Sequence, residues 1–349
     1  MRNSRLLSAL ARIIREPLVV KFVSHLTDPL YRSGYALVFS SIAGSALGMF
    51  YWLLAARYYS VETIGMNSAI IASITFLADA SQLNLKNALI RFVPSNTQSA
   101  GRMIVSAFLI SVLVAIGVSA IFLRGLRLWV PQLQFVGSSE LYILWFTWST
   151  VVWSSFILQD SALVGLRFAT WVPVKNLLFA GMKIGLLVGL TTLSPRFGVI
   201  VSWTSSTAVI VLMFNALIFG RLIRRRAQDN PRQAPEVTLP QIVRYVSADY
   251  LGSMIAVAAI NMLPLLIVAK IGVAANAHYF LAWSIAYSLY LVNLNLGTSL
   301  VSETAMDQSG LKHKSYRVFV QNARLLLPMV SVVVVFSPGI LQLFGKGYA

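Results

Sequence analysis

The chain has 349 residues, of which 57% are hydrophobic and only 11% charged, and its mean hydropathy is +0.74. A soluble globular protein is excluded, because its surface needs far more charged side chains. The net charge of +17 suggests nucleic acid, yet no basic helix with interleaved base-stacking aromatic residues is present, so nucleic acid is not expected as a partner. Cysteine is absent, which excludes disulfides and thiolate metal sites.

The first 33 residues predict an amphipathic helix that lies on the cytoplasmic surface of the membrane. One face carries Arg2, Arg5, Arg12 and Arg15, and the other carries Leu6, Leu7, Leu10, Ile13 and Ile14. Pro17 ends this helix, and no small-residue cleavage site follows, so a secretory signal peptide is not expected. A solvated basic tail is the alternative.

Nine apolar stretches follow, each close to the roughly 20 residues that a helix needs to cross about 30 Å of hydrocarbon. They are residues 34–56, 63–84, 103–123, 141–159, 174–193, 199–220, 247–269, 274–300 and 325–345. The sequence therefore predicts an all-α polytopic membrane protein with about nine transmembrane helices.

The segments between these stretches are alternately rich and poor in Lys and Arg. With the N-terminus inside, the inner segments hold 21 of the 28 basic residues and the outer segments six, while Lys183 lies within a helix. Because basic loops stay on the cytoplasmic side, we expect a multi-pass protein of the plasma (inner) membrane with a cytoplasmic N-terminus.

Two parts of the chain resemble each other at an offset of 213 residues. Residues 54–57 align with 267–270, each at the outer end of a span, and the same offset matches Thr75 with Ser288 and Gln82 with Asn295. An even number of spans separates the copies, so both run in the same direction, as in transporters built from two bundles around a central site. Chance similarity between apolar helices is the alternative.

These features divide the chain into four parts. Residues 1–33 form the interfacial segment and 34–220 a six-helix lobe, while 221–246 form a basic cytoplasmic linker and 247–349 the three helices of a partial second lobe.

Lys183 is the most informative polar residue, because a charge at the centre of the bilayer costs about 2.5–3.5 kcal/mol on insertion scales. Gly181, Gly185 and Gly189 recur on the same helix and are expected to let a neighbouring helix approach. Lys183 lies on the opposite face, which we expect to line a lumen; packing against a carboxylate, or reaching out to the interface, is the alternative.

The second span carries a polar stripe that should face the interior of the bundle. It consists of Ser68, Thr75, Asp79, Gln82 and Lys86, and Arg91 follows near the inner mouth. An ion pair of Asp79 with Lys86 or Lys183 that serves assembly alone is the alternative.

Three polar residues of the second lobe are further candidates. Asp249, near the start of the seventh span, could couple the movement of an ion or proton, although an Asp at this place also suits the helix dipole. Ser288 and Asn295 belong to a neutral polar face of the eighth span, which suits sugar recognition and equally suits hydrogen bonds between helices.

Several short motifs resemble polysaccharide flippases of the O-antigen and exopolysaccharide type. They lie at residues 48–57, 62–65 (ETIG) and 87–94 (NALIRFVP), and residues 340–349 resemble the same family after about its ninth helix. Tyr51 and Trp52 replace the basic and acidic pair that the related lipid II flippases carry there, so peptidoglycan precursor export is not expected.

The resemblance implies the two-lobed architecture of the MOP superfamily, which includes the multidrug and toxin extrusion (MATE) proteins. Its members normally have twelve to fourteen helices, so the second lobe is expected to be incomplete in this sequence. The implied substrate is a polyprenyl diphosphate-linked oligosaccharide, moved from the inner to the outer leaflet by alternating access for cell-surface polysaccharide such as lipopolysaccharide or exopolysaccharide. Membrane lipids and glycan assembly enzymes are the other implied partners.

Together these observations give a candidate site. The cations Lys183, Lys86 and Arg91 are expected to supply positive potential to a cavity between the lobes for the diphosphate, together with Gln82, Ser288 and Asn295. Asp79 and Asp249 are candidates for pairing with these cations or for a coupling ion.

Two other functions stay open. A MATE-like drug or metabolite antiporter would usually want an acidic central site. A membrane-embedded glycan polymerase or glycosyltransferase would place catalytic groups on outer loops, but residues 124–140, the longest such loop, contain no His and one carboxylate at the edge. His25, His278 and His313 are widely separated, so no enzyme, metal site or cofactor is expected.

Overall fold

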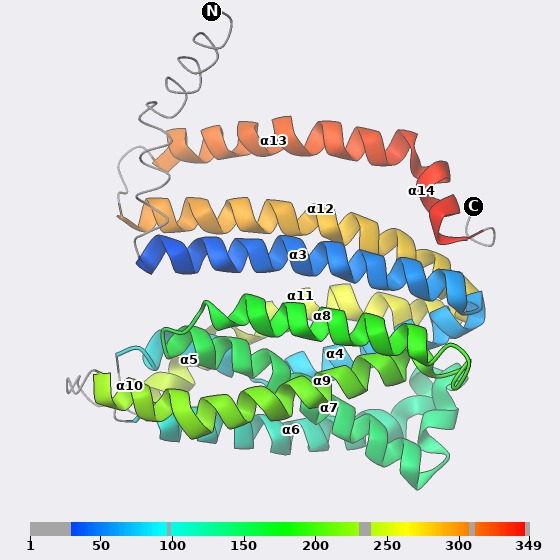
Figure 1. Ribbon diagram of the computed structural model, residues 1–349, viewed down its shortest axis with the longest axis horizontal. Helices are drawn as coiled ribbons and strands as arrows, with labels where there is room; N and C mark the ends of the chain where they lie inside the picture. Colours follow the sequence, from blue (N-terminus) through cyan, green and yellow to red (C-terminus); the bar gives the residue numbers. More distant parts are fainter. Residues whose placement is uncertain (1–28, 96–98, 230–238, 307–310, 346–349) are drawn as a thin grey trace, which may run out of the picture.

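The computed structural model describes residues 29–95, 99–229, 239–306 and 311–345. Within these residues the chain forms helices and short connections, without a β-strand (Figure 1). The predicted all-α class is confirmed, whereas the predicted interfacial helix lies outside the described residues.

The first half of the chain supplies most of the bundle. Its helices are α3 (Pro29–Tyr58), α4 (Val61–Ser81), α5 (Leu85–Phe92), α6 (Ala100–Trp129), α7 (Glu140–Gly165), α8 (Trp171–Gly189), α9 (Gly198–Leu217) and α10 (Ile223–Asp229). The 3₁₀ helix η1 (Pro131–Gly137) connects α6 to α7, and the π-helical turn η2 (Ile218–Leu222) joins α9 to α10.

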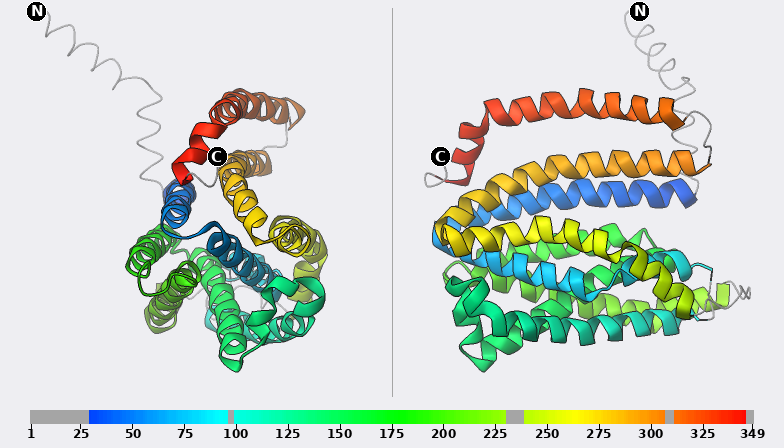
Figure 2. Two further views of the ribbon diagram at one scale, coloured as in Figure 1. Left: turned by 90° about the vertical axis from the view of Figure 1, so that its right-hand side faces the viewer. Right: turned by 180° about the vertical axis from the view of Figure 1, so that it is seen from behind.

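The second half adds α11 (Leu239–Lys270), α12 (Val273–Met306), α13 (Leu311–Val335) and α14 (Ser337–Phe344). Helix α13 lies at one edge of the bundle (Figure 2), where it packs against α12, while α14 contacts α3. The axes of α13 and α14 differ by 68°, so the predicted ninth span is broken at Phe336. Helix α11 continues through Pro264.

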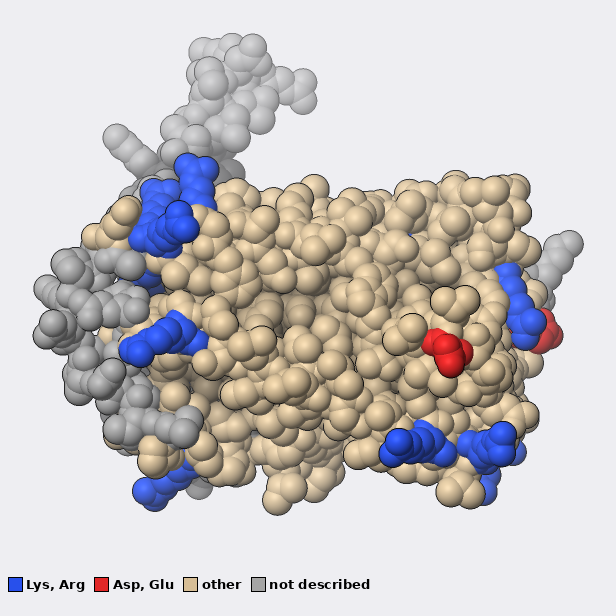
Figure 3. Space-filling model, turned by 90° about the horizontal axis from the view of Figure 1, so that it is seen from below, with Lys and Arg blue, Asp and Glu red and all other residues tan. Residues whose placement is uncertain are grey.

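Length and apolar composition separate the membrane-spanning candidates. Among the described residues, six helices are long and apolar enough to cross a bilayer, or seven if α13 and α14 count as one span. Helices α3 and α12 are not among the six, and both extend into positions whose side chains are not described. Nine spans therefore remain a prediction. Figure 3 shows Lys and Arg near both ends of the long axis and a broad middle belt without them on this face.

Helix α4 is the most deeply buried of the six candidates and packs against α6, α7, α11 and α12. The two-residue junction between α3 and α4 corresponds, within one residue, to that between α11 and α12 at the predicted offset of 213. The starts of α4 and α12 meet, because the Asn276 amide donates to the Gly65 carbonyl oxygen at 2.8 Å and to Ser68 Oγ at 3.0 Å. The two halves of the chain thus contact each other directly through α4.

Gly65 makes this contact possible. A Cβ atom at this position would overlap the main-chain carbonyl group of Val273. We therefore expect Gly65→Ala to lower the free energy of unfolding by about 1–3 kcal/mol, although Ala normally favours a helix. The measurement is the apparent melting temperature of the purified protein in detergent.

Gly185→Ala is the matched control, because Gly185 is an exposed helical glycine whose Cβ would meet no described atom. This control should keep or slightly raise the melting temperature. Equal stability of the two variants would show that the α4–α12 contact is not tight.

Candidate functional site

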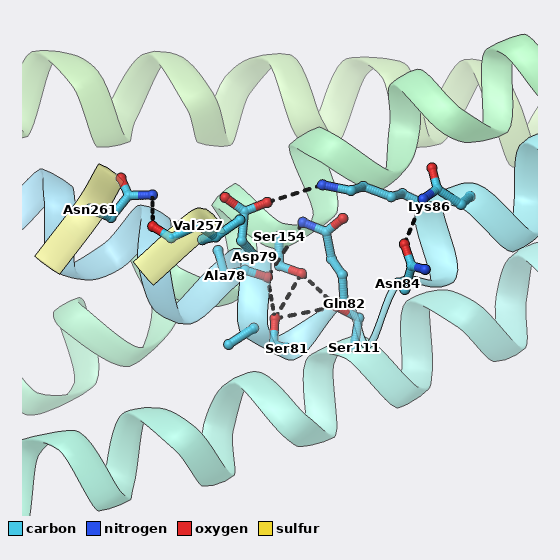
Figure 4. Close-up of polar contacts among 12 residues, drawn as sticks. Ala78, Asp79, Ser81, Gln82, Asn84, Lys86, Ser111, Ser154, Val257 and Asn261 are labelled. Carbon is cyan, nitrogen blue, oxygen red and sulfur yellow. Dashed lines mark hydrogen bonds and ion pairs between the residues drawn. The ribbon is translucent and has the colours of Figure 1, made fainter. Parts of the chain in front are cut away.

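The polar stripe ends in the charged residues Asp79 and Lys86, which lie on either side of the break between α4 and α5. Leu83 and Asn84 have left-handed backbones, with φ of 47° and 60°, so the chain turns between α4 and α5. The turn brings Lys86 back to Asp79, with 3.4 Å between Nζ and Oδ1, and leaves the two side chains 35% and 21% exposed (Figure 4). Of the alternatives for Asp79, the structure shows the pair with Lys86 and not the pair with Lys183.

Much of the remaining stripe connects α4 to the second half of the chain. Thr75 Oγ1 donates to Asn261 Oδ1 on α11 at 3.0 Å, and the Tyr250 hydroxyl donates to the Ala80 carbonyl oxygen at 3.0 Å. Arg91 continues this face: it is exposed, with its guanidinium carbon 4.6 Å from the centre of the Tyr245 ring. Polar groups of α4 and α5 thus line the boundary with α11.

Gln82 is placed differently from our expectation. It is buried, its Nε2 donates to the Ala78 carbonyl oxygen at 3.4 Å, and its Oε1 has no hydrogen-bond partner among the described residues. The neighbouring Ser81 hydroxyl joins those of Ser111 and Ser154 in a cluster between α4, α6 and α7 (Figure 4). This cluster serves helix packing, one of the two roles open to such hydroxyl rows.

Lys183 belongs to α8 and faces α3. Its Nζ is 4.7 Å from the centre of the Tyr51 ring and 4.9 Å from that of Phe179, and the residue is half-buried. The Tyr51 ring is held in place, because its hydroxyl donates to the Val199 carbonyl oxygen at 2.7 Å and lies 3.0 Å from Ser202 Oγ. No carboxylate within the described part of the chain lies within ion-pair distance of Lys183.

The glycine stripe on α8 differs from our prediction. Gly181, Gly185 and Gly189 are exposed, and a Cβ at each would meet no described atom within 4 Å. The reason is that α8 packs against α3 and α9 with its other faces, including the one that carries Lys183. The prediction that a neighbouring helix approaches closely along these glycines is therefore wrong for the described residues.

The three predicted cations do not converge. The Tyr59 hydroxyl, just before α4, donates to the Leu187 carbonyl oxygen, so the start of α4 and the end of α8 lie at the same end of the bundle. Lys183 is six residues from that end and Asp79 is 18, or ~9 Å and ~27 Å at about 1.5 Å per residue. The Asp79–Lys86 pair thus lies much deeper from this end than Lys183.

Sequence reasoning missed a second ion pair. Lys175 on α8 is fully buried, and its Nζ lies 2.8 Å from Asp160 Oδ1 on α7. The same ammonium donates to the Phe156 carbonyl oxygen and lies 3.5 Å from the centre of the Phe156 ring. The sequence does contain a signal for this pair. Asp160 and Lys175 have opposite charges and lie at similar distances from the short connection between α7 and α8.

The side chains of Asp249, Ser288 and Asn295 lie outside the described part, although their backbones belong to α11 and α12. Their roles remain predictions. Among the described residues, no three His, Asp or Glu side chains gather in a way that could hold a metal ion.

The fold agrees with that of solved transporters. A multidrug resistance MATE family transporter of the MOP superfamily, in an inward-facing conformation, has a TM-score of 0.63 at 14% identity, over 88% of this chain and 73% of its own. A MOP superfamily transporter from Pyrococcus furiosus, described as having a binding pocket of reverse polarity, gives 0.60 at 16% identity, over 92% and 75%. A MATE in complex with MaL6 gives 0.59 at 16% identity over the same shares.

The sequence matches no protein-family model and no curated protein. The likeness in fold at these low identities, together with the apolar helices, defines a multi-pass membrane protein with a MATE-like fold.

The buried Asp160–Lys175 pair gives a prediction for stability. Asp160→Leu leaves the Lys175 ammonium without its anion, so we expect the free energy of unfolding to fall by about 3–5 kcal/mol. The double variant Asp160→Leu/Lys175→Met removes both charges and should recover most of this loss. Unfolding in detergent measures both effects.

The Asp79–Lys86 pair is the control, because it is partly exposed and its loss should cost less than about 1 kcal/mol. If Asp160→Leu is as stable as the unchanged protein, the ion pair does not hold α7 and α8 together.

Proposed function

We propose that this protein is a transporter that moves a polyprenyl diphosphate-linked oligosaccharide from the inner to the outer leaflet by alternating access. Lipid-linked oligosaccharide and membrane lipids are its proposed partners, together with the glycan assembly enzymes that make or use the substrate. The cell inner membrane is the proposed location.

The charge balance of the described spans carries this proposal. Asp79 is paired with Lys86, and Asp160 with Lys175, so these two carboxylates are neutralised. Glu62 and Glu140 are exposed in the first turns of α4 and α7. Lys183 contacts ring faces and has no described carboxylate partner, which leaves an excess positive charge within the bundle. An anionic substrate group can compensate this charge, whereas a cationic substrate would be repelled.

The attraction has a useful size. Two unit charges about 4 Å apart attract by roughly 4 kcal/mol at an effective dielectric constant near 20. Aromatic faces hold the ammonium by cation–π attraction of about 0.5–2 kcal/mol, which orients it without cancelling its charge. Lys183 therefore remains available to a diphosphate while the lipid tail stays in the bilayer.

A MATE-like antiporter of drugs or metabolites is the second candidate, and the fold supports it directly. The neighbour with a binding pocket of reverse polarity supports the idea that this fold serves substrates of different charge. The pairing of Asp79 and Asp160 disfavours a cationic drug. An enzyme that extends the glycan is a third possibility, which covalent growth of the labelled glycan would reveal.

The test is leaflet exchange of a fluorescent polyprenyl diphosphate-linked oligosaccharide in liposomes that contain the purified protein. We expect Lys183→Ala to reduce the initial rate at least about tenfold, because one ion contact of more than about 1.4 kcal/mol is lost. Lys183→Arg keeps the charge and should retain much of the rate.

Lys270→Ala is the control, because it removes the same charge from an exposed position at the end of α11. It should leave the rate unchanged. Normal exchange by Lys183→Ala would contradict the role of this residue, while export of a planar cation without any exchange of the labelled lipid would favour the antiporter.

A further inference from the structure

One face of α12 carries four aromatic residues in a row, which we call the aromatic ladder: Tyr279, Trp283, Tyr287 and Tyr290. Their spacing of four, four and three residues keeps them on one side of the helix. Successive ring centres are 6.2, 6.2 and 5.8 Å apart, and the ring planes differ by 12°, 34° and 34°. The four rings therefore form a row with similar orientations.

The ladder lies on the side of α12 that is turned toward α4. Asn276, one turn before Tyr279, makes the hydrogen bonds to Gly65 and Ser68 on α4. About three turns farther along, Tyr287 lies on the same face of α12 as Asn276, and α12 packs along α4. The rings thus lie beside the polar stripe of α4, between the two halves of the chain.

The packing of α12 against the edge helices uses a different face. Ala282, Ile285, Ala286 and Leu289 line an apolar groove together with residues of α13 and α14. None of the four ladder residues takes part in this lining. The ladder therefore lies on a different face of α12 from this groove.

The ladder also carries one buried polar group whose bonding capacity is unused among the described residues. The Tyr279 hydroxyl is buried without a hydrogen-bond partner among the described residues, and Tyr290 is 45% exposed. A buried hydroxyl without a partner is costly, and a Phe would avoid that cost if packing were its only purpose. Rings with polar tips beside a polar helix are typical of ligand-binding surfaces.

We propose that the aromatic ladder binds the sugar rings of the transported lipid, an inference that rests on the proposed function. A pyranose ring has faces of C–H bonds that stack on aromatic rings, and it carries hydroxyls around its rim. Those hydroxyls can donate to the Asp79 carboxylate and bond to the phenol groups of the ladder. The charge on Asp79 is already compensated by Lys86, so this carboxylate suits a neutral hydrogen-bond donor better than a cation.

The depth of the ladder fits this role. Tyr279 is six residues and Tyr290 is 17 residues from the start of α12, or ~9 Å and ~26 Å at about 1.5 Å per residue. The ladder thus covers the depths between Lys183 and the Asp79–Lys86 pair. Sugar rings attached to a diphosphate would find an aromatic surface throughout that interval.

The test compares two fluorescent probes in equilibrium binding to the purified chain: polyprenyl diphosphate with a short oligosaccharide, and bare polyprenyl diphosphate. We expect Trp283→Leu to weaken binding of the glycan-bearing probe about tenfold and to leave the bare probe unchanged, because one stacking surface is lost. Trp283→Phe keeps a ring and should restore most of the affinity. Lys183→Ala should weaken both probes.

Trp148→Leu is the matched control, since it makes the same change at a Trp that is 46% exposed on α7. It should bind both probes normally, and melting temperatures identify any variant that fails to fold. Tyr287→Leu and Tyr287→Phe form a second pair that repeats the comparison on the adjacent ring.

The outcomes separate the two proposals. Equal affinity of Trp283→Leu and the unchanged protein for the glycan-bearing probe, or equal losses for both probes, would overturn the ladder proposal alone. Selective loss of binding to a planar cation such as ethidium, with the glycan probe unaffected, would also overturn it. If the unchanged protein binds neither lipid probe, the proposed function fails and the ladder proposal fails with it.

Discussion

The structure depends on how charge is compensated inside a bundle that water reaches poorly. Lys175 is fully buried and satisfied by Asp160, a main-chain oxygen and a ring, so it is an element of assembly. Lys86 and Asp79 satisfy each other while staying partly exposed at the break between α4 and α5. Lys183 differs, because its described contacts are ring faces, which orient an ammonium without neutralising it. This difference in compensation separates a structural lysine from a candidate binding lysine.

Helix α4 connects these charged residues to both halves of the chain. It carries the polar stripe, and it packs against both first-half helices and α11 and α12 of the second half. Polar residues on such a helix are kept from lipid, and their contacts cross the boundary between the halves, as with Thr75 and Asn261. Any relative movement of the halves must therefore remake hydrogen bonds of α4, since its stripe is shared between them.

Sequence predicted what periodicity and composition determine. The helices, the apolar spans and the inward direction of the α4 stripe follow from the cost of exposing polar groups to lipid. The partners of individual side chains do not follow from it. Gln82 is buried and donates to the Ala78 carbonyl oxygen of its own helix, and the glycines of α8 face outward, because helix rotation depends on packing with distant segments. The pairing of Lys175 does not follow from periodicity either, because its partner Asp160 lies on another helix.

The separation in depth between Lys183 and Lys86 changes the mechanism that three converging cations would have implied. Lys183 has no described carboxylate partner, whereas the Asp79–Lys86 pair, ~18 Å farther along the bundle, carries no net charge. The aromatic ladder covers the depths between them with surfaces that carry no net charge. Under the proposed function, Lys183 compensates the diphosphate, while the glycan contacts the rings and the neutralised Asp79–Lys86 pair. The charged and the uncharged parts of the substrate thus meet different surfaces of the bundle.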